Sequence, residues 1–195
     1  MLSLLLRRFS PLLLFLLFAC HHTDYSTLPP MGEDHWIRMV VETPAGQNFV
    51  SRYDSENKIF IPTVQLNKSL PENWNLGFVP AGSQKKAEQN YRLVEVLLLS
   101  SPKTQGTVLK IIPLGMLRMQ TGDGPRVLLL AAPADPSDRL AGTETPEEMA
   151  MVFPEIFEQV EKNLALTVYK ANPQSLTWAD PTKTWQFIFS MIEIQ

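Results

Sequence analysis

The chain of 195 residues has one cysteine, Cys20, only three histidines, and charged residues at 19%. A single cysteine excludes an internal disulfide. No basic patch or stripe of stacking aromatic residues appears, so the sequence gives no indication of a nucleic-acid partner. The apolar run from Pro11 to Phe18 is too short to span a membrane.

What is present at the N-terminus is typical of a secretory signal: Arg7 and Arg8 precede the apolar run, which ends in Ala19-Cys20. The tetrad L-F-A-C at residues 17–20 resembles a bacterial lipoprotein signal. That resemblance implies removal of residues 1–19, a lipid on Cys20, and a membrane of the bacterial cell envelope as location and partner. A simple signal peptide without lipid is the alternative.

The segment after the signal is rich in polar residues and includes Pro29-Pro30 and Gly32. Such a composition favours a flexible tether, predicted over residues 20–34. Loss of Arg7 and Arg8 with the signal leaves 15 basic against 20 acidic residues, a net charge near −5. The remaining residues 35–195 suit one globular domain.

Short β-patterns separated by Gly and Pro turns predict a mainly β fold, with a small barrel as its preferred form. The expected strands are residues 36–43, 49–54, 58–62, 90–101, 106–119 and 126–132. Two helices follow. The first begins at a Thr145-Pro146 start signal and is expected to kink or to break into two pieces at Pro154, and the second begins at Asp180-Pro181.

The strand at residues 90–101 carries two charges, Arg92 and Glu95, in a mostly apolar run. Burying a lone carboxylate costs several kcal/mol, so we expect Glu95 to meet a cation, a metal or strong hydrogen-bond donors.

Seven short motifs, in order, resemble those of the soluble, magnesium-dependent inorganic diphosphatases. They are V-V-E-T-P-A-G (40–46), R-Y-D (52–54), N-L-G-F-V-P (75–80), V-E-V-L (94–97), P-L-G-M-L-R-M (113–119), A-P-A-D-P (132–136) and W-A-D (178–180). The resemblance implies a five-stranded Greek-key, OB-like barrel with two flanking C-terminal helices. It also implies an enzyme that holds several Mg²⁺ ions on acidic residues and clamps diphosphate with Lys, Arg and Tyr.

Most of the site residues that the resemblance implies are replaced. Only Glu42, Asp54 and Glu95 are kept, or conserved in type. The replaced positions are Val50 for a lysine, Arg52 for a glutamate, Leu76 for a tyrosine, Asn90, Arg92, Thr121 and Arg126 for aspartates, and Leu128 for a lysine. The family's Tyr-Lys pair falls near Val160-Glu161.

The replacements share a direction, because arginines stand at former acid positions while former phosphate-binding cations have become apolar. Guanidinium groups can neutralise Glu42 and Glu95 internally, and we expect Arg52 or Arg126 to pair with one of them. The sequence therefore predicts a catalytically inactive binding or structural module for a small anion or a protein, with no cofactor. The alternative is a weak or active Mg²⁺-dependent diphosphatase or phosphohydrolase, with Glu42 and Glu95 as the remaining metal ligands.

The lipoprotein reading predicts that Cys20→Ser abolishes membrane fractionation, because the thiol is the atom that would carry the lipid. Membrane and soluble fractions of cells that express each form would be compared by immunoblot. Wild-type protein in the soluble fraction, with an unmodified Cys20, would contradict it.

Overall fold

The computed structural model describes residues 23–33, 36–80 and 94–192. Cys20, Asn90 and Arg92 lie outside these residues. Among the described residues, no helix is both long and apolar enough to cross a membrane.

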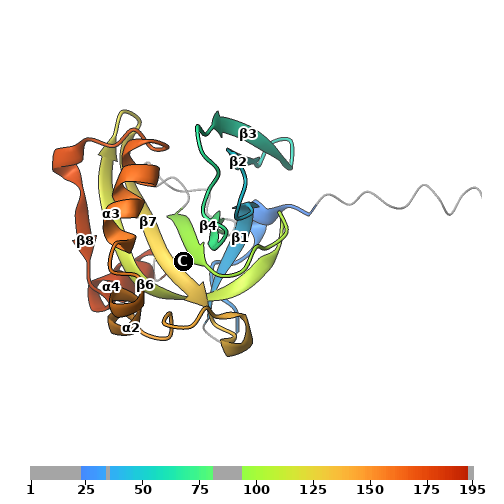
Figure 1. Ribbon diagram of the computed structural model, residues 1–195. Coiled ribbons are helices and arrows are strands. Elements are labelled where there is room, and N and C mark those ends of the chain that lie inside the picture. The colour runs from blue at the N-terminus through green and yellow to red at the C-terminus, as the bar shows by residue number, and fades with distance from the viewer. Residues whose placement is uncertain (1–22, 34–35, 81–93, 193–195) are drawn as a thin grey trace, which may run out of the picture.

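A five-stranded barrel forms the centre of the domain (Figure 1). The strands follow the order β1-β4-β5-β7-β6, and pairing of β1 with β6 closes the ring. Only the β5–β7 pairing is parallel; the other barrel pairings are antiparallel. The strands are β1 Ile37–Thr43, β4 Trp74–Val79, β5 Val94–Leu99, β6 Val108–Thr121 and β7 Gly124–Pro133. The predicted small barrel is confirmed.

Three further strands lie outside the barrel. Strand β8 (Thr177–Ala179) pairs with β6 and extends its sheet. Strands β2 (Phe49–Asp54) and β3 (Ile59–Gln65) form a separate antiparallel hairpin that projects beside the barrel (Figure 1). Pro62 lies within β3, which is compatible with a strand because β3 pairs on one side only.

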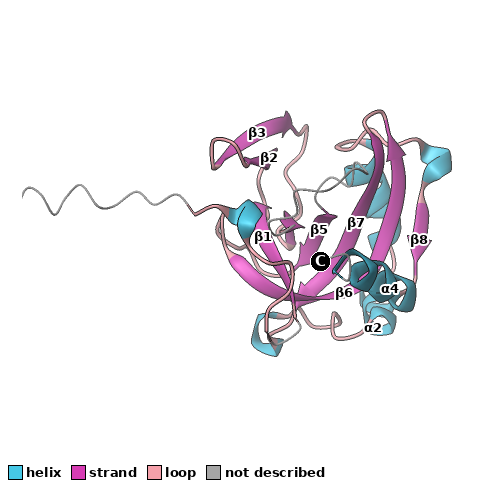
Figure 2. Ribbon diagram, turned by 180° about the vertical axis from the view of Figure 1, so that it is seen from behind, coloured by secondary structure: helices cyan, strands magenta, loops and turns pink. Residues whose placement is uncertain are grey.

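Helices cover two faces of the sheet. Met149, Ile156 and Leu164 come from α2 (Pro146–Val152), α3 (Ile156–Val160) and the π-helix η4 (Glu161–Leu166), and they pack in one core with Leu97 and Leu128. A second core contains Ile188 of α4 (Pro181–Ile192), which lies against β6 in the rear view (Figure 2).

Of the kink or break predicted for the first helix, the structure shows the break. The Thr145 side chain accepts a hydrogen bond from the Glu148 N–H at 3.1 Å, and Pro146 occupies the first turn. α2 then ends before Pro154, which lacks the N–H for the next helical bond, and α3 starts two residues later.

Strand β4 was not predicted, although its motif was noted. All six residues are buried, so the alternating pattern that identifies a half-exposed strand is missing. Gly77 is required there, because a Cβ atom at this position would lie 2.0 Å from the Val40 carbonyl oxygen on the neighbouring strand.

The N-terminal segment differs from the predicted flexible tether over residues 23–33. Tyr25–Thr27 form a short 3-10 helix, η2, and the Arg38 N–H donates to the Pro30 carbonyl at 2.8 Å. Met31 forms a β-bridge with Ile37. This part of the chain lies against the domain because side chains such as Tyr25 pack on it, which composition alone does not reveal.

Candidate functional site

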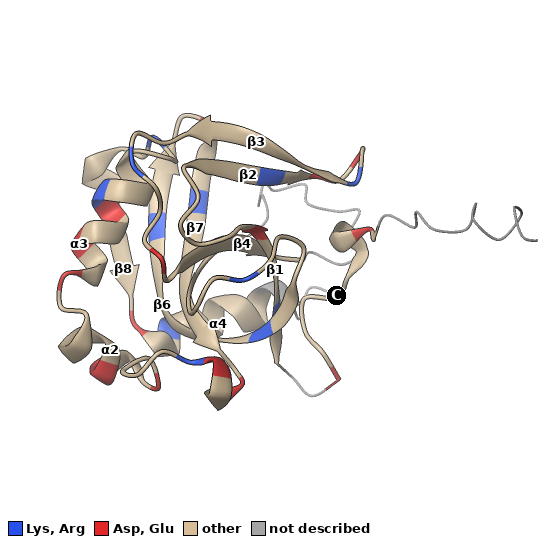
Figure 3. Ribbon diagram, turned by 45° about the vertical axis from the view of Figure 1, so that its right-hand side comes forward, with Lys and Arg blue, Asp and Glu red and all other residues tan. Residues whose placement is uncertain are grey.

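The site is an ion-pair cluster in which one arginine joins three strands. Glu42 lies on β1, Glu95 on β5, and Arg52 on β2 of the projecting hairpin. Arg52 Nη1 contacts Glu42 Oε2 at 3.2 Å and also bonds Glu95 Oε2. Figure 3 shows basic positions on β2 and β7 beside the end of the barrel.

A second arginine completes the neutralisation. Arg126, on β7, contacts Glu95 Oε1 at 3.1 Å, and its other terminal nitrogen lies 3.2 Å from Asp123 Oδ2. The parallel register pairs Glu95 with Leu128, and Arg126, two residues earlier on β7, points to the same face. The prediction that Arg52 or Arg126 pairs with a former site carboxylate is confirmed for both arginines.

All four carboxylate oxygens of Glu42 and Glu95 therefore accept from a protein donor. Three of these oxygens accept from Arg52 or Arg126, and the fourth, Glu42 Oε1, accepts from the Tyr53 backbone N–H at 2.6 Å. The Glu42 and Glu95 side chains are 2% and 8% exposed, whereas those of Arg52 and Arg126 are 24% and 14% exposed. The acids are buried and the arginines form the outer layer of the cluster.

The aromatic ring of Tyr169 packs against both arginines of the cluster, and the sequence analysis did not identify this residue. Its ring centre lies 5.3 Å from the guanidinium carbon of Arg52 and 5.8 Å from that of Arg126, within cation–π range. The hydroxyl is buried without a hydrogen-bond partner of normal geometry.

The Tyr-Lys pair that the resemblance placed near Val160-Glu161 is not at the cluster. Val160 is fully buried in the core, and Glu161 accepts from the indole N–H of Trp178 at 2.8 Å. The tyrosine at the cluster is instead Tyr169, which follows the π-helix η4. The dipeptide Tyr169-Lys170 was the available signal in the sequence.

Burial shapes the electrostatics of the cluster. It raises the pKa of Glu42 to about 7, an effect that Arg52 and the Tyr53 N–H reduce but do not cancel. Burial likewise raises the pKa of Tyr169, and the charge of Glu95 raises it further. Burial acts to lower the pKa of Arg52, but Tyr169 and the two carboxylates raise it by more, so this side chain stays charged.

Asp54 and Thr121 have local roles away from the cluster. The Asp54 carboxylate accepts from Asn57 Nδ2 at 2.6 Å and from the Glu56 N–H, which caps the hairpin turn, and the Asn57 side chain lowers the pKa of Asp54. Thr121 Oγ1 donates to the Gly124 carbonyl at 2.9 Å in the β6–β7 turn.

Three other substituted positions are core residues: Val50, Leu76 and Leu128 are each at most 1% exposed and belong to one apolar cluster. Asn90 and Arg92 fall outside the described part of the chain.

The donors that the described residues offer do not suit a magnesium site. Within residues 23–33, 36–80 and 94–192, no three Asp, Glu, His or Cys side chains gather where they could hold a metal ion. Mg²⁺ requires free oxygen ligands in near-octahedral geometry, whereas the oxygens of Glu42 and Glu95 are already engaged by guanidinium and amide donors.

Comparison with known proteins decides the family. The family model described as inorganic pyrophosphatase matches residues 39–194. The chain belongs to the inorganic pyrophosphatase family. The Saccharolobus solfataricus inorganic pyrophosphatase is 29% identical over 103 residues, which is 52% of this chain and 58% of that protein. The Sulfolobus acidocaldarius enzyme is 26% identical, over 52% of this chain and 57% of its own length.

Solved structures show the same fold. The Thermus thermophilus inorganic pyrophosphatase superposes with a TM-score of 0.68 at 20% identity, covering 88% of this chain and 98% of that one. The Neisseria gonorrhoeae protein gives 0.63 at 22% identity, covering 87% and 98%. In sequence, this pyrophosphatase-family chain spans 57–58% of the length of the first two relatives.

Arg52→Ala is expected to lower the free energy of unfolding by about 3–5 kcal/mol, because it leaves two buried carboxylates short of a partner. Urea unfolding would measure the loss. Arg118→Ala is the matched control, since Arg118 is an exposed β6 residue whose guanidinium lies over Phe187 outside the cluster. Equal stability of the two variants would contradict the bridging role of Arg52.

Glu42 should make stability depend on pH. Its folded-state pKa lies above its ordinary value of 4.5, so its stabilising contribution is complete below about pH 4.5 and is lost as the pH rises through 7. We expect the free energy of unfolding of wild type, relative to Glu42→Gln, to fall by a few kcal/mol between about pH 5 and pH 8. Urea titrations at each pH test this, and a flat difference would refute it.

Proposed function

We propose that this chain is a catalytically inactive member of the inorganic pyrophosphatase family, with a binding or structural role at the bacterial cell envelope, where a lipid on Cys20 anchors it. The single observation that supports inactivity is the engagement of all four oxygens of Glu42 and Glu95 by Arg52, Arg126 and the Tyr53 N–H.

The chemistry implied by the family explains why this engagement matters. Bound Mg²⁺ would activate a water and stabilise the charge that develops on the phosphates. In this chain each guanidinium places a fixed positive charge within 3.2 Å of an acid that would otherwise hold metal. An entering Mg²⁺ would have to displace a partly buried arginine from a buried carboxylate and then lie beside it, and both steps are unfavourable.

The proposed location agrees with inactivity. Removal of diphosphate is a housekeeping task of biosynthesis in the cytoplasm, and an exported domain would be separated from that source of substrate. The sequence feature behind this part of the proposal is the lipoprotein-like L-F-A-C tetrad at residues 17–20.

A phosphohydrolase is the second candidate. Two features favour it: arginines bind phosphate through paired hydrogen bonds, and the pKa of Glu42 near 7 is suited to proton transfer at neutral pH. Such an enzyme would need Arg52 or Arg126 to release its carboxylate when substrate binds.

The two candidates differ in turnover. For the inactive protein we expect phosphate release from diphosphate well below about 1 s⁻¹, with or without Mg²⁺. Malachite-green detection of phosphate would measure the rate. Turnover above that level would contradict the inactive protein and favour the phosphohydrolase.

Melting curves provide an independent control on the metal. Wild-type protein should show no shift of Tm at millimolar Mg²⁺, because an ion stabilises only a protein that binds it when folded. The double variant Arg52→Glu/Arg126→Asp, which restores the acids that the family resemblance implies, should gain a Mg²⁺-dependent shift. A shift in wild type that Glu95→Ala removes would reveal a working metal site.

A further inference from the structure

Residues 23–31, the N-terminal strap, connect the barrel to the β2–β3 hairpin. One end is fixed to β1, because the Arg38 N–H donates to the Pro30 carbonyl at 2.8 Å. The other end reaches the hairpin, where Lys58 forms an ion pair with Asp24 at 3.3 Å. The strap therefore spans two parts of the fold that lie in separate sheets.

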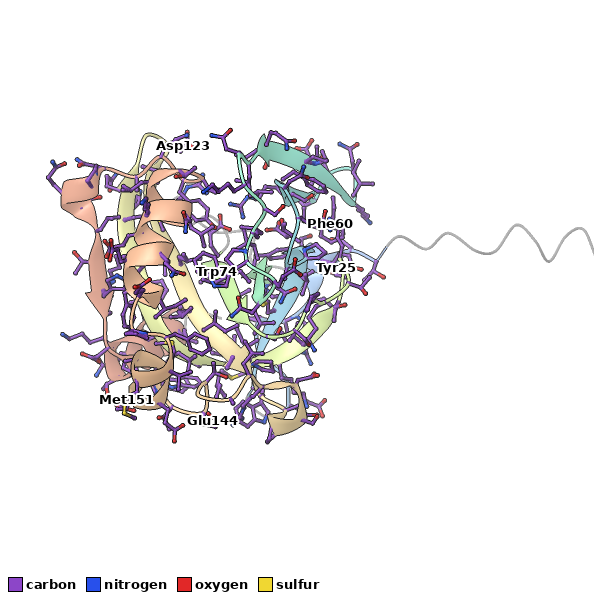
Figure 4. The ribbon with its side chains drawn as sticks, in the orientation of Figure 1. Tyr25, Phe60, Trp74, Asp123, Glu144 and Met151 are labelled. Atoms are coloured by element: carbon purple, nitrogen blue, oxygen red, sulfur yellow. The ribbon has the colours of Figure 1, made fainter. Side chains whose placement is uncertain are left out.

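Tyr25 is the residue by which the strap holds the hairpin. Its ring lies 5.3 Å from that of Tyr53 and 5.5 Å from that of Phe60, and its N–H donates to the Tyr53 hydroxyl at 3.2 Å. Figure 4 shows Tyr25 and Phe60 on the same side of the molecule. Gly106 leaves room for the Tyr25 hydroxyl, because a Cβ atom at position 106 would lie 2.6 Å from it. The Tyr25 side chain thus lies between the hairpin and the turn before β6.

The outer half of the hairpin is held by side chains. Within the described part of the chain, no backbone ladder joins β2 or β3 to a barrel strand. Val50 fixes the base of the hairpin, because it is fully buried in the core beneath. Beyond it, side chains of β1 supply the bonds: Thr43 Oγ1 accepts from the Ser51 N–H at 2.8 Å, and Glu42 Oε1 accepts from the Tyr53 N–H at 2.6 Å.

Tyr53 connects the strap to the charged cluster. Its hydroxyl is bonded to Tyr25 of the strap and its N–H to Glu42, while its neighbour Arg52 bridges Glu42 and Glu95. We propose that the N-terminal strap locks Arg52 onto these two acids, so that release of the strap lets the outer hairpin open as one unit and exposes both carboxylates. Displacement of residues 23–31 would then open the cluster from a distance, through a single strand.

Hydrogen–deuterium exchange on the full chain in detergent solution tests the lock. Tyr25→Ala should speed exchange in residues 49–54 by about tenfold, because loss of two aromatic contacts makes opening of the hairpin easier. Tyr25→Phe is the matched control, since it keeps the ring and the N–H, and it should leave this exchange unchanged. Residues 146–152 of α2 form none of these contacts and should exchange alike in each protein. Unchanged exchange of residues 49–54 in Tyr25→Ala, or equal acceleration of α2, would overturn the proposal.

Coupling between two sites is reciprocal, so a change at Arg52 must also loosen the strap. Arg52→Lys keeps the charge but loses the forked guanidinium that bridges two acids. We expect severalfold faster exchange in residues 24–31 of this variant. Arg118→Lys, at an exposed β6 position outside the cluster, should leave that exchange unchanged. Acceleration confined to residues 49–54 in Arg52→Lys would show that strap and cluster act independently, and the proposal would be wrong.

Discussion

The bridge from Arg52 to Glu42 and Glu95 is the interaction on which the arrangement of this protein most depends. It places one cation between β1, β5 and a hairpin that belongs to neither strand's sheet. Two buried carboxylates without a cation would each cost several kcal/mol. The position of the β2–β3 hairpin and the burial of Glu42 and Glu95 therefore both depend on the Arg52 bridge.

In the proposed inactive protein, arginines that belong to the chain hold the carboxylates, where the family resemblance implies an exchangeable metal ion. A metal site keeps its carboxylates available to ions from solution, whereas Arg52 and Arg126 are always present and always charged. Tyr169 adds a flat surface beneath both guanidinium groups, which limits their movement away from the acids. The proposed loss of catalysis and a stability independent of Mg²⁺ follow from the same substitution.

The hairpin links this cluster to the N-terminal segment of the described chain. Arg52 on β2 faces the cluster, while its neighbour Tyr53 points to the other side and packs with Tyr25 of the N-terminal segment. Alternation of side chains along one strand thus allows six residues to serve both surfaces. A partner that moved the hairpin would disturb both.

The sequence by itself determined the family, the barrel and the helix break at Pro154, because ordered motifs, turn residues and a missing N–H act locally. It also indicated that Arg52 or Arg126 would neutralise Glu42 or Glu95, because a change of charge at a motif position is visible in the sequence without any structure. Only the tertiary structure decided that Asp54 serves a turn, that Tyr169 underlies the arginines, and that Tyr25 fastens the expected tether. The Asp54 role depends on the geometry of the hairpin turn, and the other two depend on contacts between segments far apart in the sequence. Neither periodicity nor composition encodes these.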